Sequence, residues 1–490
     1  MVDSAEQRRA RALAALQKAL PARALRVDAR ARKPFESDGL TALRELPWVV
    51  ALPDTVDQVR VVLDICREHG IPVVPRGAGT GLSGGARPQS DGLLLGLSRL
   101  NRILEIDPDN AVMRVEPGVR NLAISQAAAP FGLYYAPDPS SQIACSIGGN
   151  VAENAGGVHC LKYGLTVHNV VGLRALTYAG DELVLGGKVA DAPGYDLLAL
   201  FIGSEGLLGI VTEVTVKLLP VPPEKRVLLA AFADITAAAD AVGAIIAAGI
   251  VPAGLEMMDR RAIAAAEAFV HAGYPESAAA ILLCELDGVA AEVDDALGRV
   301  RSVLLGHGAF SLRVATDAAE QAKLWLGRKA AFPAVGRLAP DYYCMDGTIP
   351  RARLGEVLKT ISAMEETFGL AVANVFHAGD GNLHPLILYD ANAPGETARA
   401  EAMGEQILEL CVAVGGTVSG EHGVGLEKLN PMCAQFTAAE LEQMHRVKAA
   451  FDPERLLNPG KAVPTLVRCA EHGAMHVHGG KLPFPHLPRF

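Results

Sequence analysis

The sequence predicts an α+β fold built from two successive cycles of strands and helices. Short aliphatic runs alternate with helical patterns in residues 46–222, and a second alternation fills residues 223–465. A proline-containing link, Leu218–Pro223, separates the two cycles. With 490 residues, half of them hydrophobic, the chain is long enough for two or three separate cores. We therefore expect a first domain over residues 46–222 and a second over residues 223–465.

The elements of the first cycle have clear start and stop signals. After an N-terminal segment, residues 1–45, with an amphipathic helix expected over residues 4–24, the run WVVALP predicts a strand. TVDQVRVVLDICREHG predicts a helix that starts after Thr55 and ends at Gly70. The strand IPVVPRG then leads into a glycine-rich loop. Further elements are expected in GLLLGLSRL, RILEID, AVMRVEPGV, NLAISQAAAPFG and GIVTEVTVKLL.

The second cycle repeats strand and helix with short glycine links. This order predicts a ferredoxin-like sheet with helices on one face. Within it, AVANVFHAGDGNLHPLILY predicts two strands around a turn. The last residues, 466–490, are expected to form a separate extended tail, and residues 468–490 are a candidate docking segment for a partner.

Composition excludes several classes of protein. The net charge of -10 argues against a nucleic-acid surface, which is usually basic. The eight cysteines are scattered with no C-x-x-C pair, which favours reduced thiols and excludes a ferredoxin-type iron–sulfur cluster within this chain. The start lacks the apolar run of a signal peptide, and no run is long enough to span a bilayer. We expect a cytoplasmic protein that reaches the inner membrane, if at all, through partners.

Three glycine-rich segments indicate a large cofactor. PRGAGTGLSGG, Pro75–Gly85, has five glycines after an apolar strand, so its amide groups can wrap an anion such as a pyrophosphate. It matches neither the P-loop nor the Rossmann pattern, and a flexible turn is the alternative. The segments Pro137–Gly157 and Phe201–Val214 are also rich in small residues and suit a planar ligand.

Two further motifs predict a metal site. His377 and His384 flank a glycine turn, and Glu421 stands beside His422 in SGEHGVG. Two histidines and a carboxylate with an open position form a ligand set for a catalytic divalent ion; zinc is favoured, and iron or manganese also fits. The alternative is that the histidines are hydrogen-bonded core residues.

These motifs resemble a known family. PRGAGTGLSGG, CSIGGNVAENAGG and GSEGLLGIVTEVTVKL resemble the PCMH-type FAD-binding domain of the vanillyl-alcohol-oxidase superfamily. FHAGDGNLHP, SGEHGVG and FDPERLLNPGK resemble its D-2-hydroxyacid dehydrogenase branch, and PDYYCMDGTIPR and RCAEHGAMHVHG resemble the glycolate-oxidising members of that branch. The resemblance implies FAD bound by the first domain, a substrate and metal domain after it, and a C-terminal segment that returns to the FAD.

The resemblance also implies which residues hold FAD. The first glycine loop would bind the pyrophosphate, and the other segments would line the adenine, ribose and flavin. The cofactor-binding candidates are Pro75, Arg76, Gly77, Ala78, Gly79, Thr80, Gly81, Leu82, Ser83, Gly84, Pro137, Ser141, Ser146, Gly148, Gly149, Asn154, Gly156, Gly157, Gly206, Ile210 and Asn458. Because the first loop has no histidine for a covalent link, we expect FAD to be bound non-covalently.

The resemblance assigns roles to the metal motifs. His377, His384 and Glu421 would be the ligands, and His422 would be the base that takes the substrate hydroxyl proton, because an imidazole has a suitable pKa. The alternative for His422 is that it only orients Glu421. The ion would lower the pKa of the hydroxyl, and FAD would accept the hydride.

Arg328 is the candidate for binding the substrate carboxylate in a bidentate fork. A surface ion pair is its alternative, and Lys329 and Arg337 are close in sequence. Relatives that oxidise 2-hydroxyglutarate carry a lysine where we place Cys344, and Phe332 stands where a hydroxyl would help hold a second carboxylate. Both differences favour a small substrate, glycolate or D-lactate, over a dicarboxylate.

The expected function is oxidation of a small 2-hydroxy acid, such as glycolate to glyoxylate. The expected partners are a second flavin-domain subunit and an iron–sulfur subunit of a glycolate oxidase complex. Three alternatives remain: a stand-alone D-lactate dehydrogenase using cytochrome or quinone, a non-catalytic FAD-binding subunit, and an FAD-dependent reductase of UDP-sugars. The set His377, His384, Glu421 and His422 argues against the non-catalytic subunit, which needs neither a metal nor a base. The UDP-sugar reductases share the FAD domain but not these metal motifs.

Overall fold

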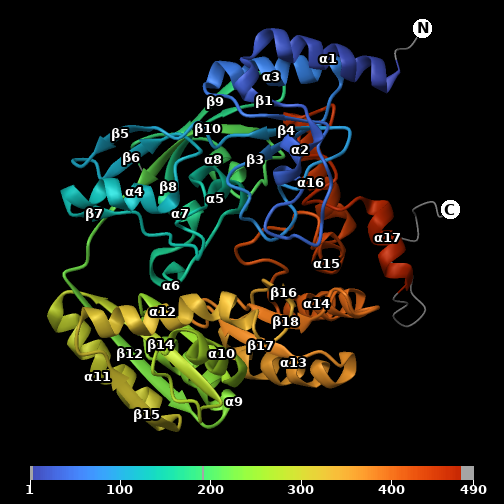
Figure 1. Cartoon of the computed structure of the whole chain (residues 1–490). Coiled ribbons are helices and arrows are strands. Elements are labelled where there is room, and N and C mark those ends of the chain that lie inside the picture. The colour runs from blue at the N-terminus through green and yellow to red at the C-terminus, as the bar shows by residue number, and fades with distance from the viewer. Residues whose placement is uncertain (1–3, 190–192, 476–490) are drawn as a thin grey trace. The chain divides into compact units, whose positions relative to one another are not determined.

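The computed structural model describes residues 4–189 and 193–475, and it divides into two compact units (Figure 1). The first unit takes in the described parts of Met1–Gly156, Leu165–Pro220 and Glu421–Phe490. The second takes in Gly157–Gly164 and Val221–Gly420. Both units contain helices and sheets, so the predicted α+β class is confirmed.

A four-stranded sheet lies at the start of the first unit, with the strand order β1-β2-β4-β3. Helix α3 packs against α1, and it begins after its cap Thr55 and ends at the left-handed Gly70, as the sequence predicts. The apolar side chains of α1, α3 and the strands share one core. The elements here are α1 (Ala5–Ala19), β1 (Leu25–Arg26), α2 (Ala29–Arg32), β2 (Val49–Ala51), α3 (Val56–His69), β3 (Val73–Arg76) and β4 (Leu93–Gly96), with 3₁₀ turns η1 (Ala22–Ala24) and η2 (Lys33–Phe35).

A five-stranded antiparallel sheet follows, in the order β5-β6-β10-β8-β9. The strand β10 shows strict alternation of buried and half-buried residues, so only one face of the sheet packs on a core. Its elements are β5 (Ile103–Asp107), β6 (Val112–Val115), α4 (Asn121–Ala128), η3 (Ala129–Phe131), β7 (Leu133–Tyr134), α5 (Ile147–Glu153), α7 (Thr166–Asn169), β8 (Val170–Leu176), β9 (Glu182–Gly186), α8 (Leu197–Phe201), β10 (Ile210–Lys217) and β11 (Leu219–Pro220), of which β7 and β11 form a separate pair.

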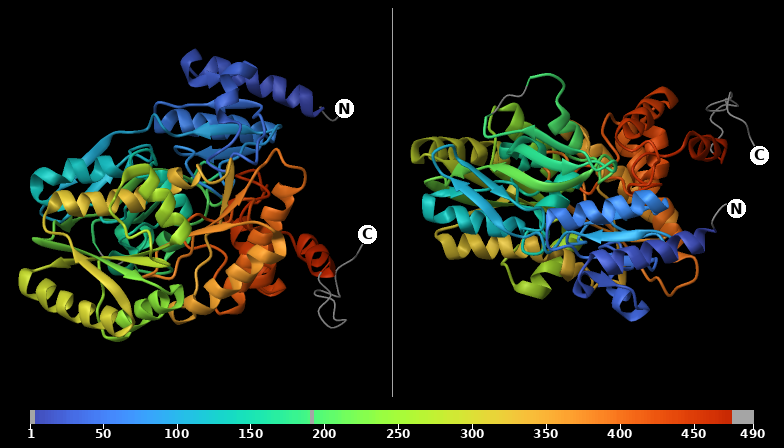
Figure 2. Two further views of the ribbon diagram at one scale, coloured as in Figure 1. Left: turned by 60° about the horizontal axis from the view of Figure 1, so that its bottom comes forward. Right: turned by 90° about the horizontal axis from the view of Figure 1, so that it is seen from above.

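The C-terminal segment completes the first unit. Helices α15 (Leu429–Gln435), α16 (Ala438–Phe451) and α17 (Leu466–Met475) are drawn in red in Figures 1 and 2. Leu457 forms a parallel bridge with Val73, and the Asn458 amide donates to the Val73 carbonyl at 2.7 Å. We predicted a substrate domain that extends to residue 465, whereas the unit that follows Pro220 ends at Gly420 and the later residues pack with the first unit.

The second unit is built on a seven-stranded antiparallel sheet in the order β15-β12-β14-β13-β17-β18-β16. Its strands are β12 (Glu224–Phe232), β13 (Gly254–Asp259), β14 (Ala280–Gly288), β15 (Ala309–Val314), β16 (Asp341–Cys344), β17 (Val372–Phe376) and β18 (Pro385–Tyr389). Its helices are α6 (Cys160–Tyr163), α9 (Ile235–Ala247), α10 (Arg260–Val270), α11 (Ala290–Gly306), α12 (Ala318–Val335), α13 (Leu354–Phe368) and α14 (Glu396–Ala413), with the 3₁₀ turn η4 (Arg351–Arg353).

The prediction of helices on one face of this sheet is wrong. Helices α10 and α12 share a core with one face, whereas α9, α11, α13 and α14 form a second connected layer (Figures 1 and 2). The strand β14 is buried from Ala280 to Asp287 without alternation, because both faces of the sheet are covered. Its unbroken apolar run AILLC was the sequence signal of that burial.

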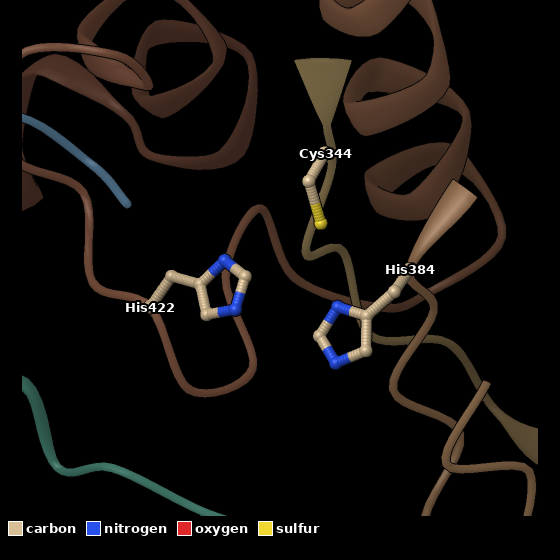
Figure 3. Close-up of side chains that lie close together, drawn as sticks. All are labelled: Cys344, His384 and His422. Carbon is tan, nitrogen blue, oxygen red and sulfur yellow. The ribbon is translucent and has the colours of Figure 1, made fainter. Parts of the chain in front are cut away.

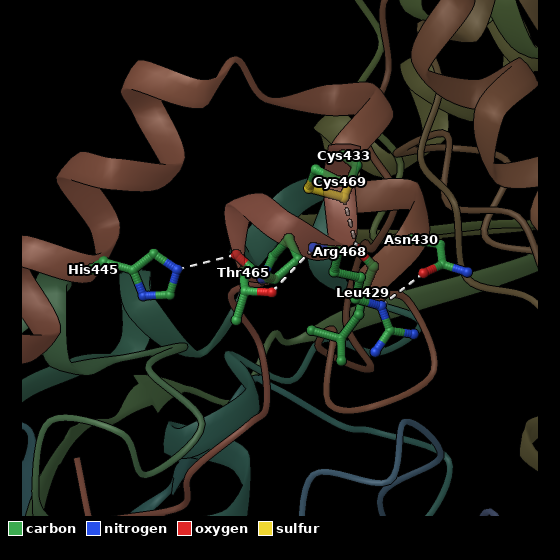
Figure 4. The surroundings of a disulfide bond; sticks show 8 residues. Leu429, Asn430, Cys433, His445, Thr465, Arg468 and Cys469 are labelled. Atoms are coloured by element: carbon green, nitrogen blue, oxygen red, sulfur yellow. Dashed lines mark hydrogen bonds between the residues drawn. A yellow bond between two sulfur atoms is a disulfide. The ribbon is translucent and has the colours of Figure 1, made fainter. Parts of the chain in front are cut away.

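The prediction of reduced thiols is wrong for two of the eight cysteines. Cys433 on α15 and Cys469 on α17 form a disulfide (Figure 4). They are 36 residues apart in sequence, so their pairing depends on the packing of α15 against α17. The other cysteines are free thiols, and all but Cys160 are buried.

Across the two described stretches, no helix has the length and apolarity needed to cross a bilayer. The prediction of an extended tail is wrong for its described part, because Leu466–Met475 form the helix α17. The rest of the predicted docking tail lies outside the described residues, which end at Met475.

Candidate functional site

The first glycine loop lies against the start of α5. Ser146 caps α5, with its Oγ accepting from the Gly149 amide at 3.4 Å. A Cβ on Gly77 would lie 2.4 Å from Ser146 Oγ, so a larger residue there would displace the hydroxyl that caps α5. Helix α5 was not predicted from the sequence, because Gly148 and Gly149 are weak helix formers.

The main-chain amides of this loop are available to a ligand. Among the described residues, none of the N–H groups from Gly77 to Gly84 donates a hydrogen bond to the protein. The Arg76 guanidinium lies at Gly79, where an added Cβ would meet it at 2.1 Å, and its Nη1 donates to the Ser37 carbonyl at 2.7 Å. Burial lowers the pKa of Arg76, and the charge of Asp38 opposes that shift. Unsatisfied amides beside a guanidinium are the chemistry that holds a pyrophosphate.

A cavity of about 470 Å³ opens beside this loop. Two of the predicted FAD residues, Ala78 and Ser146, line it. Asn101, Gly118 and Arg120 line it as well, and sequence reasoning did not select them. These three follow strands of the first unit without a glycine cluster, so no local motif marks them.

The other predicted FAD residues of the first unit fall into three groups. Gly148 and Gly206 are fixed by packing, since a Cβ would lie 2.6 Å from the Pro117 Cβ and 2.4 Å from the Pro75 Cγ respectively. Asn154 and Asn458 have left-handed backbones and use their side chains to join segments of the unit. The remaining residues lie in the loops around α5 and at the start of β10: Pro137, Ser141, Gly156 and Ile210. Gly157, predicted with them, belongs to the second unit.

In the second unit, the hairpin β17–β18 brings the two predicted ligands together. The His377 amide donates to the Asn382 carbonyl at 3.0 Å, and the Gly381 amide donates back to the His377 carbonyl at 3.1 Å. Gly381 has a φ of +85°, where a Cβ would lie 2.2 Å from the Ile349 carbonyl oxygen. The rings of His377 and His384 are 5.0 Å apart between centroids and nearly perpendicular.

Both imidazoles are held through Nδ1. His377 Nδ1 lies 2.8 Å from Glu256 Oε1, and His384 Nδ1 lies 3.2 Å from the Met345 carbonyl oxygen. Metal-binding histidines are commonly oriented in this way by a carboxylate or a carbonyl. Nε2 is then the nitrogen of each ring that would coordinate an ion, so the pair fits a metal.

Glu256 also contacts Arg328, the predicted carboxylate-binding residue. Arg328 Nη2 lies 2.6 Å from Glu256 Oε2, and both side chains are almost completely buried. Burial would raise the pKa of Glu256, but the charges of His377 and Arg328 lower it below its usual value. Lys329 and Arg337 are exposed, so Arg328 is the one of these three basic residues that lies beside the histidines.

Cys344 and Asp346 complete this side of the second unit. The Cys344 Sγ and one carboxylate oxygen of Asp346 each lie within 4.8 Å of a His384 ring nitrogen (Figure 3 shows Cys344 and His384). Phe332 lies edge-on to His384, with the ring centroids 6.0 Å apart. Asp346 Oδ2 accepts from Ser419 Oγ at 2.7 Å and from the Gly420 amide at 3.1 Å. His422, also labelled in Figure 3, belongs with Glu421 to the first unit.

Sequence reasoning missed Glu256 and Asp346. Glu256 is an acid inside the apolar run GLEMMD of β13, and a buried charge in a strand is the signal that would have selected it. Asp346 follows β16 in YYCMDG, and a polar residue at a strand end is a weaker signal.

Two family models match the chain. The model described as "FAD binding domain" matches residues 47–186, and "FAD linked oxidases, C-terminal domain" matches residues 221–462. Three curated relatives are similar over most of their length. The chain is 64% identical to "Glycolate oxidase subunit GlcD" of Escherichia coli (strain K12), over 93% of this chain and 92% of that protein. It is 41% identical to "Glycolate oxidase subunit GlcD" of Bacillus subtilis (strain 168), over 88% and 92%. It is 33% identical to "D-lactate dehydrogenase" of Anaerostipes hadrus, over 85% and 89%.

Solved structures share the fold. p-Cresol methylhydroxylase with bound substrate superposes with a TM-score of 0.79 at 19% identity, over 94% of this chain and 97% of that one. The 4-ethylphenol oxidase of Gulosibacter chungangensis superposes with a TM-score of 0.77 at 18% identity, over 94% and 98%. At this identity the match establishes the fold alone.

Proposed function

This chain belongs to the family of FAD-linked oxidases that includes the glycolate oxidase subunits GlcD, and we propose that it oxidises a small 2-hydroxy acid, converting glycolate to glyoxylate. The observation that carries the proposal is the buried group in the second unit, where Glu256 joins His377 to Arg328 and His384 stands beside them. It combines metal-type histidines with a cation suited to a carboxylate.

FAD fits the first unit. The loop Gly77–Gly84 and Arg76 would hold its pyrophosphate, and the cavity lined by Ala78 and Ser146 would take an adjoining part. When bound, FAD supplies the acceptor for the hydride that leaves the substrate carbon. The loop contains no histidine or cysteine side chain for a covalent link, in keeping with non-covalent binding.

A divalent ion, with zinc favoured, fits His377 and His384 through Nε2. We propose Glu421 as the third ligand, supported by its place in the chain directly after Gly420, whose amide is held by Asp346. Such an ion would supply the charge that lowers the pKa of the substrate hydroxyl. Glu256 fixes the ring of His377, and the Met345 carbonyl fixes that of His384.

The protein residues then have distinct tasks. Arg328 binds the substrate carboxylate: apart from its ion pair with Glu256, its Nε and Nη2 have no hydrogen-bond acceptor among the described residues. His422 takes the hydroxyl proton as the reaction proceeds. Burial of Arg328, Glu256 and both histidines excludes water and strengthens these electrostatic contacts.

The residues around His384 support a short substrate. Cys344 and Phe332 add no charge there, so a second carboxylate would have to be buried without a partner. We propose glycolate first and D-lactate second.

The test is anaerobic reduction of the FAD-loaded chain by glycolate, D-lactate, L-lactate and D-2-hydroxyglutarate, followed by flavin absorbance in a stopped-flow with and without a chelator. Fast bleaching by glycolate that the chelator abolishes is the expected result. Bleaching by none of the four acids, with metal and FAD bound, would overturn the proposal.

A stand-alone D-lactate dehydrogenase is the second candidate, favoured by the similarity to the D-lactate dehydrogenase of Anaerostipes hadrus. Faster bleaching by D-lactate, with full turnover of the purified chain on an artificial acceptor, would identify it.

A further inference from the structure

Glu205 binds the main chain of the segment that follows His422. Its Oε1 accepts from the Val424 amide at 2.7 Å, and its Oε2 accepts from the Gly425 amide at 2.7 Å. Two consecutive amides directed at one carboxylate form a small anion-binding nest. Glu205 is 6% exposed and has a φ of +51°, a conformation that persists only where the surroundings enforce it. All of these residues belong to the first unit.

The same segment is tied to the first glycine loop. The Ser83 carbonyl accepts from the Leu426 amide at 2.9 Å and from the Glu427 amide at 3.1 Å. Gly425 allows this approach, because a Cβ there would lie 2.2 Å from the Ser83 carbonyl oxygen. Residues 424–427 therefore contact both Ser83 of the proposed pyrophosphate loop and Glu205, which precedes the proposed FAD residue Gly206.

The C-terminal segment holds this junction in place. Asn458 Nδ2 donates to the Glu205 carbonyl at 2.7 Å and to the Gly85 carbonyl at 3.2 Å. The Ala462 amide donates to the Gly425 carbonyl at 2.9 Å. Lys461 Nζ donates to the Gly85 carbonyl at 2.8 Å. The segments that meet at this junction are thus joined to one another by more than one hydrogen bond each.

A second acid, Glu153, lies at the same junction; its side chain is half-buried and its Oε2 is fully buried. A Cβ on Gly423 would lie 1.9 Å from Glu153 Oε2. Burial raises the pKa of Glu153 well above its usual range, and the charge of Glu205 raises it further. Burial raises the pKa of Glu205 as well, but the hydrogen bonds from the Val424 and Gly425 amides, and after them the charges of Lys428 and Lys461, oppose that shift. We therefore assign the negative charge to Glu205 and the neutral form to Glu153.

We propose that Glu205 is a positioning residue that sets the Glu421–His422 segment against the FAD-binding loops and so couples cofactor binding to the order of that segment. The roles of Glu421 and His422 rest on the proposed function. The coupling itself rests on contacts within the first unit. The Glu205 side chain does not need to touch substrate or FAD for this role.

The test compares Glu205→Gln with Glu153→Gln in the full chain. Both substitutions are isosteric and lie at one buried junction. Glu205→Gln would direct a side-chain NH₂ group at a backbone N–H, whereas Glu153→Gln replaces one neutral side chain by another. We expect FAD binding to slow amide hydrogen exchange of residues 421–427 in the wild type and in Glu153→Gln, and to have little effect in Glu205→Gln. Flavin reduction by the hydroxy acid should fall by about 10–100-fold in Glu205→Gln, the effect of a small misplacement of catalytic groups, with KM nearly unchanged.

Equal exchange and equal reduction rates in Glu205→Gln and the wild type would overturn the proposal. Equal damage in both variants would overturn it as well, because it would show a general loss of core stability. If Glu205→Gln does not fold, Glu205→Asp is the second variant. It keeps the negative charge, but its side chain is one methylene shorter, so the carboxylate lies farther from the two amides. An intermediate loss of protection is expected. Failure of the wild type to reduce flavin would refute the proposed function, whereas the exchange comparison would still decide the coupling.

Discussion

Glu256 is the residue on which the candidate site of the second unit depends most. It accepts from His377 Nδ1 and pairs with Arg328, so one carboxylate orients a proposed ligand and a proposed substrate-binding group. The sequence pattern predicts that His377 and His384 lie together, because they are seven positions apart around a turn. It does not show Glu256, which is 121 positions from His377 and meets it only through the pairing of β13 with β17.

We expect Glu256→Gln to weaken metal binding by about 10–100-fold, the usual effect of removing a partner that orients a metal ligand. Gln can accept one hydrogen bond from His377 but leaves Arg328 without its counter-charge. The measurement is competition for the metal against a chelator of known affinity. Glu285→Gln is the control, since it removes a buried carboxylate of the neighbouring strand that contacts no proposed ligand. Equal loss in both variants would contradict the assignment.

Glu285 itself predicts a pH dependence of stability. Burial would raise its pKa, but the hydrogen bond and charge of His159, together with Lys225, lower the pKa from 4.5 to about 2. A carboxyl with a folded pKa below its unfolded value stabilises the protein above about pH 4.5, and that stabilisation is lost as the pH falls toward 2.

We expect Glu285→Gln to lower the free energy of unfolding by about 3 kcal/mol at pH 6, from 1.36 kcal/mol for each pKa unit. The difference from the wild type should shrink steadily below pH 4.5. Urea titrations of both proteins at a series of pH values measure it. A difference that does not change with pH would show that the ion pair contributes nothing.

At the scale of elements, the ends of helices and the positions of turns are predicted best where one residue type enforces one backbone conformation. Thr55 and Gly70 mark both ends of α3, and the glycine turn marks the β17–β18 hairpin. Helix α5 was missed because its glycines disfavour a helix, and the fold enforces it through the Ser146 cap. The two-sided burial of the seven-stranded sheet depends on helices distant in sequence, and no local pattern contains that information.

The hairpin predicts an effect of Gly381→Ala. The positive φ and the contact with the Ile349 carbonyl oppose any side chain, so we expect a loss of more than about 2 kcal/mol of stability, together with loss of bound metal. Gly369→Ala is the matched control: Gly369 has a φ of +60° at the end of α13 with nothing within 4 Å of the added Cβ, so about 1 kcal/mol is expected. Urea unfolding and metal analysis of both variants decide the comparison.

The disulfide between α15 and α17 leads to a separate prediction about stability. A disulfide that closes a loop of 36 residues restricts the unfolded chain, and loop entropy gives about 3–4 kcal/mol for it. Reductant should therefore lower the Tm of the wild type. It should leave the Tm of Cys469→Ser unchanged, and that Tm should match the reduced wild type. A wild type whose Tm does not respond to reductant would show that the bond is absent in solution.

At the scale of the whole molecule, the order of the two cycles along the chain does not show which segments pack into one compact unit. The link Leu218–Pro223 lies at the end of the first cycle, as the proline-containing sequence indicates, and Val221 begins the second unit. The first unit, however, is made of three separate stretches, because the segment after Gly420 supplies Leu457 to the edge of β3. From the linear sequence alone, that segment is grouped with the residues that precede it in the chain, which belong to the second unit.

The proposed partners predict how the isolated chain should behave. We expect it to reduce its flavin with glycolate but to turn over slowly, because the sequence has no cysteine cluster of the ferredoxin type to carry electrons onward. The measurement compares the stopped-flow reduction rate with steady-state turnover, before and after addition of a second flavin-domain subunit and an iron–sulfur subunit. Similar rates without partners would favour the stand-alone dehydrogenase. A place in the cytoplasm, at the membrane only through these partners, is part of the same proposal.

The discontinuous first unit also has a consequence for synthesis on the ribosome. Val73 and its partner Leu457 are separated by more than three-quarters of the chain, so the edge of β3 emerges long before the residues that cover it. At about 5–20 residues per second, that delay is roughly 20–80 s. The stretch Val221–Gly420, whose strands pair with one another, can complete its sheet within that interval. We therefore expect the first unit to be the part of the nascent chain that depends most on chaperones.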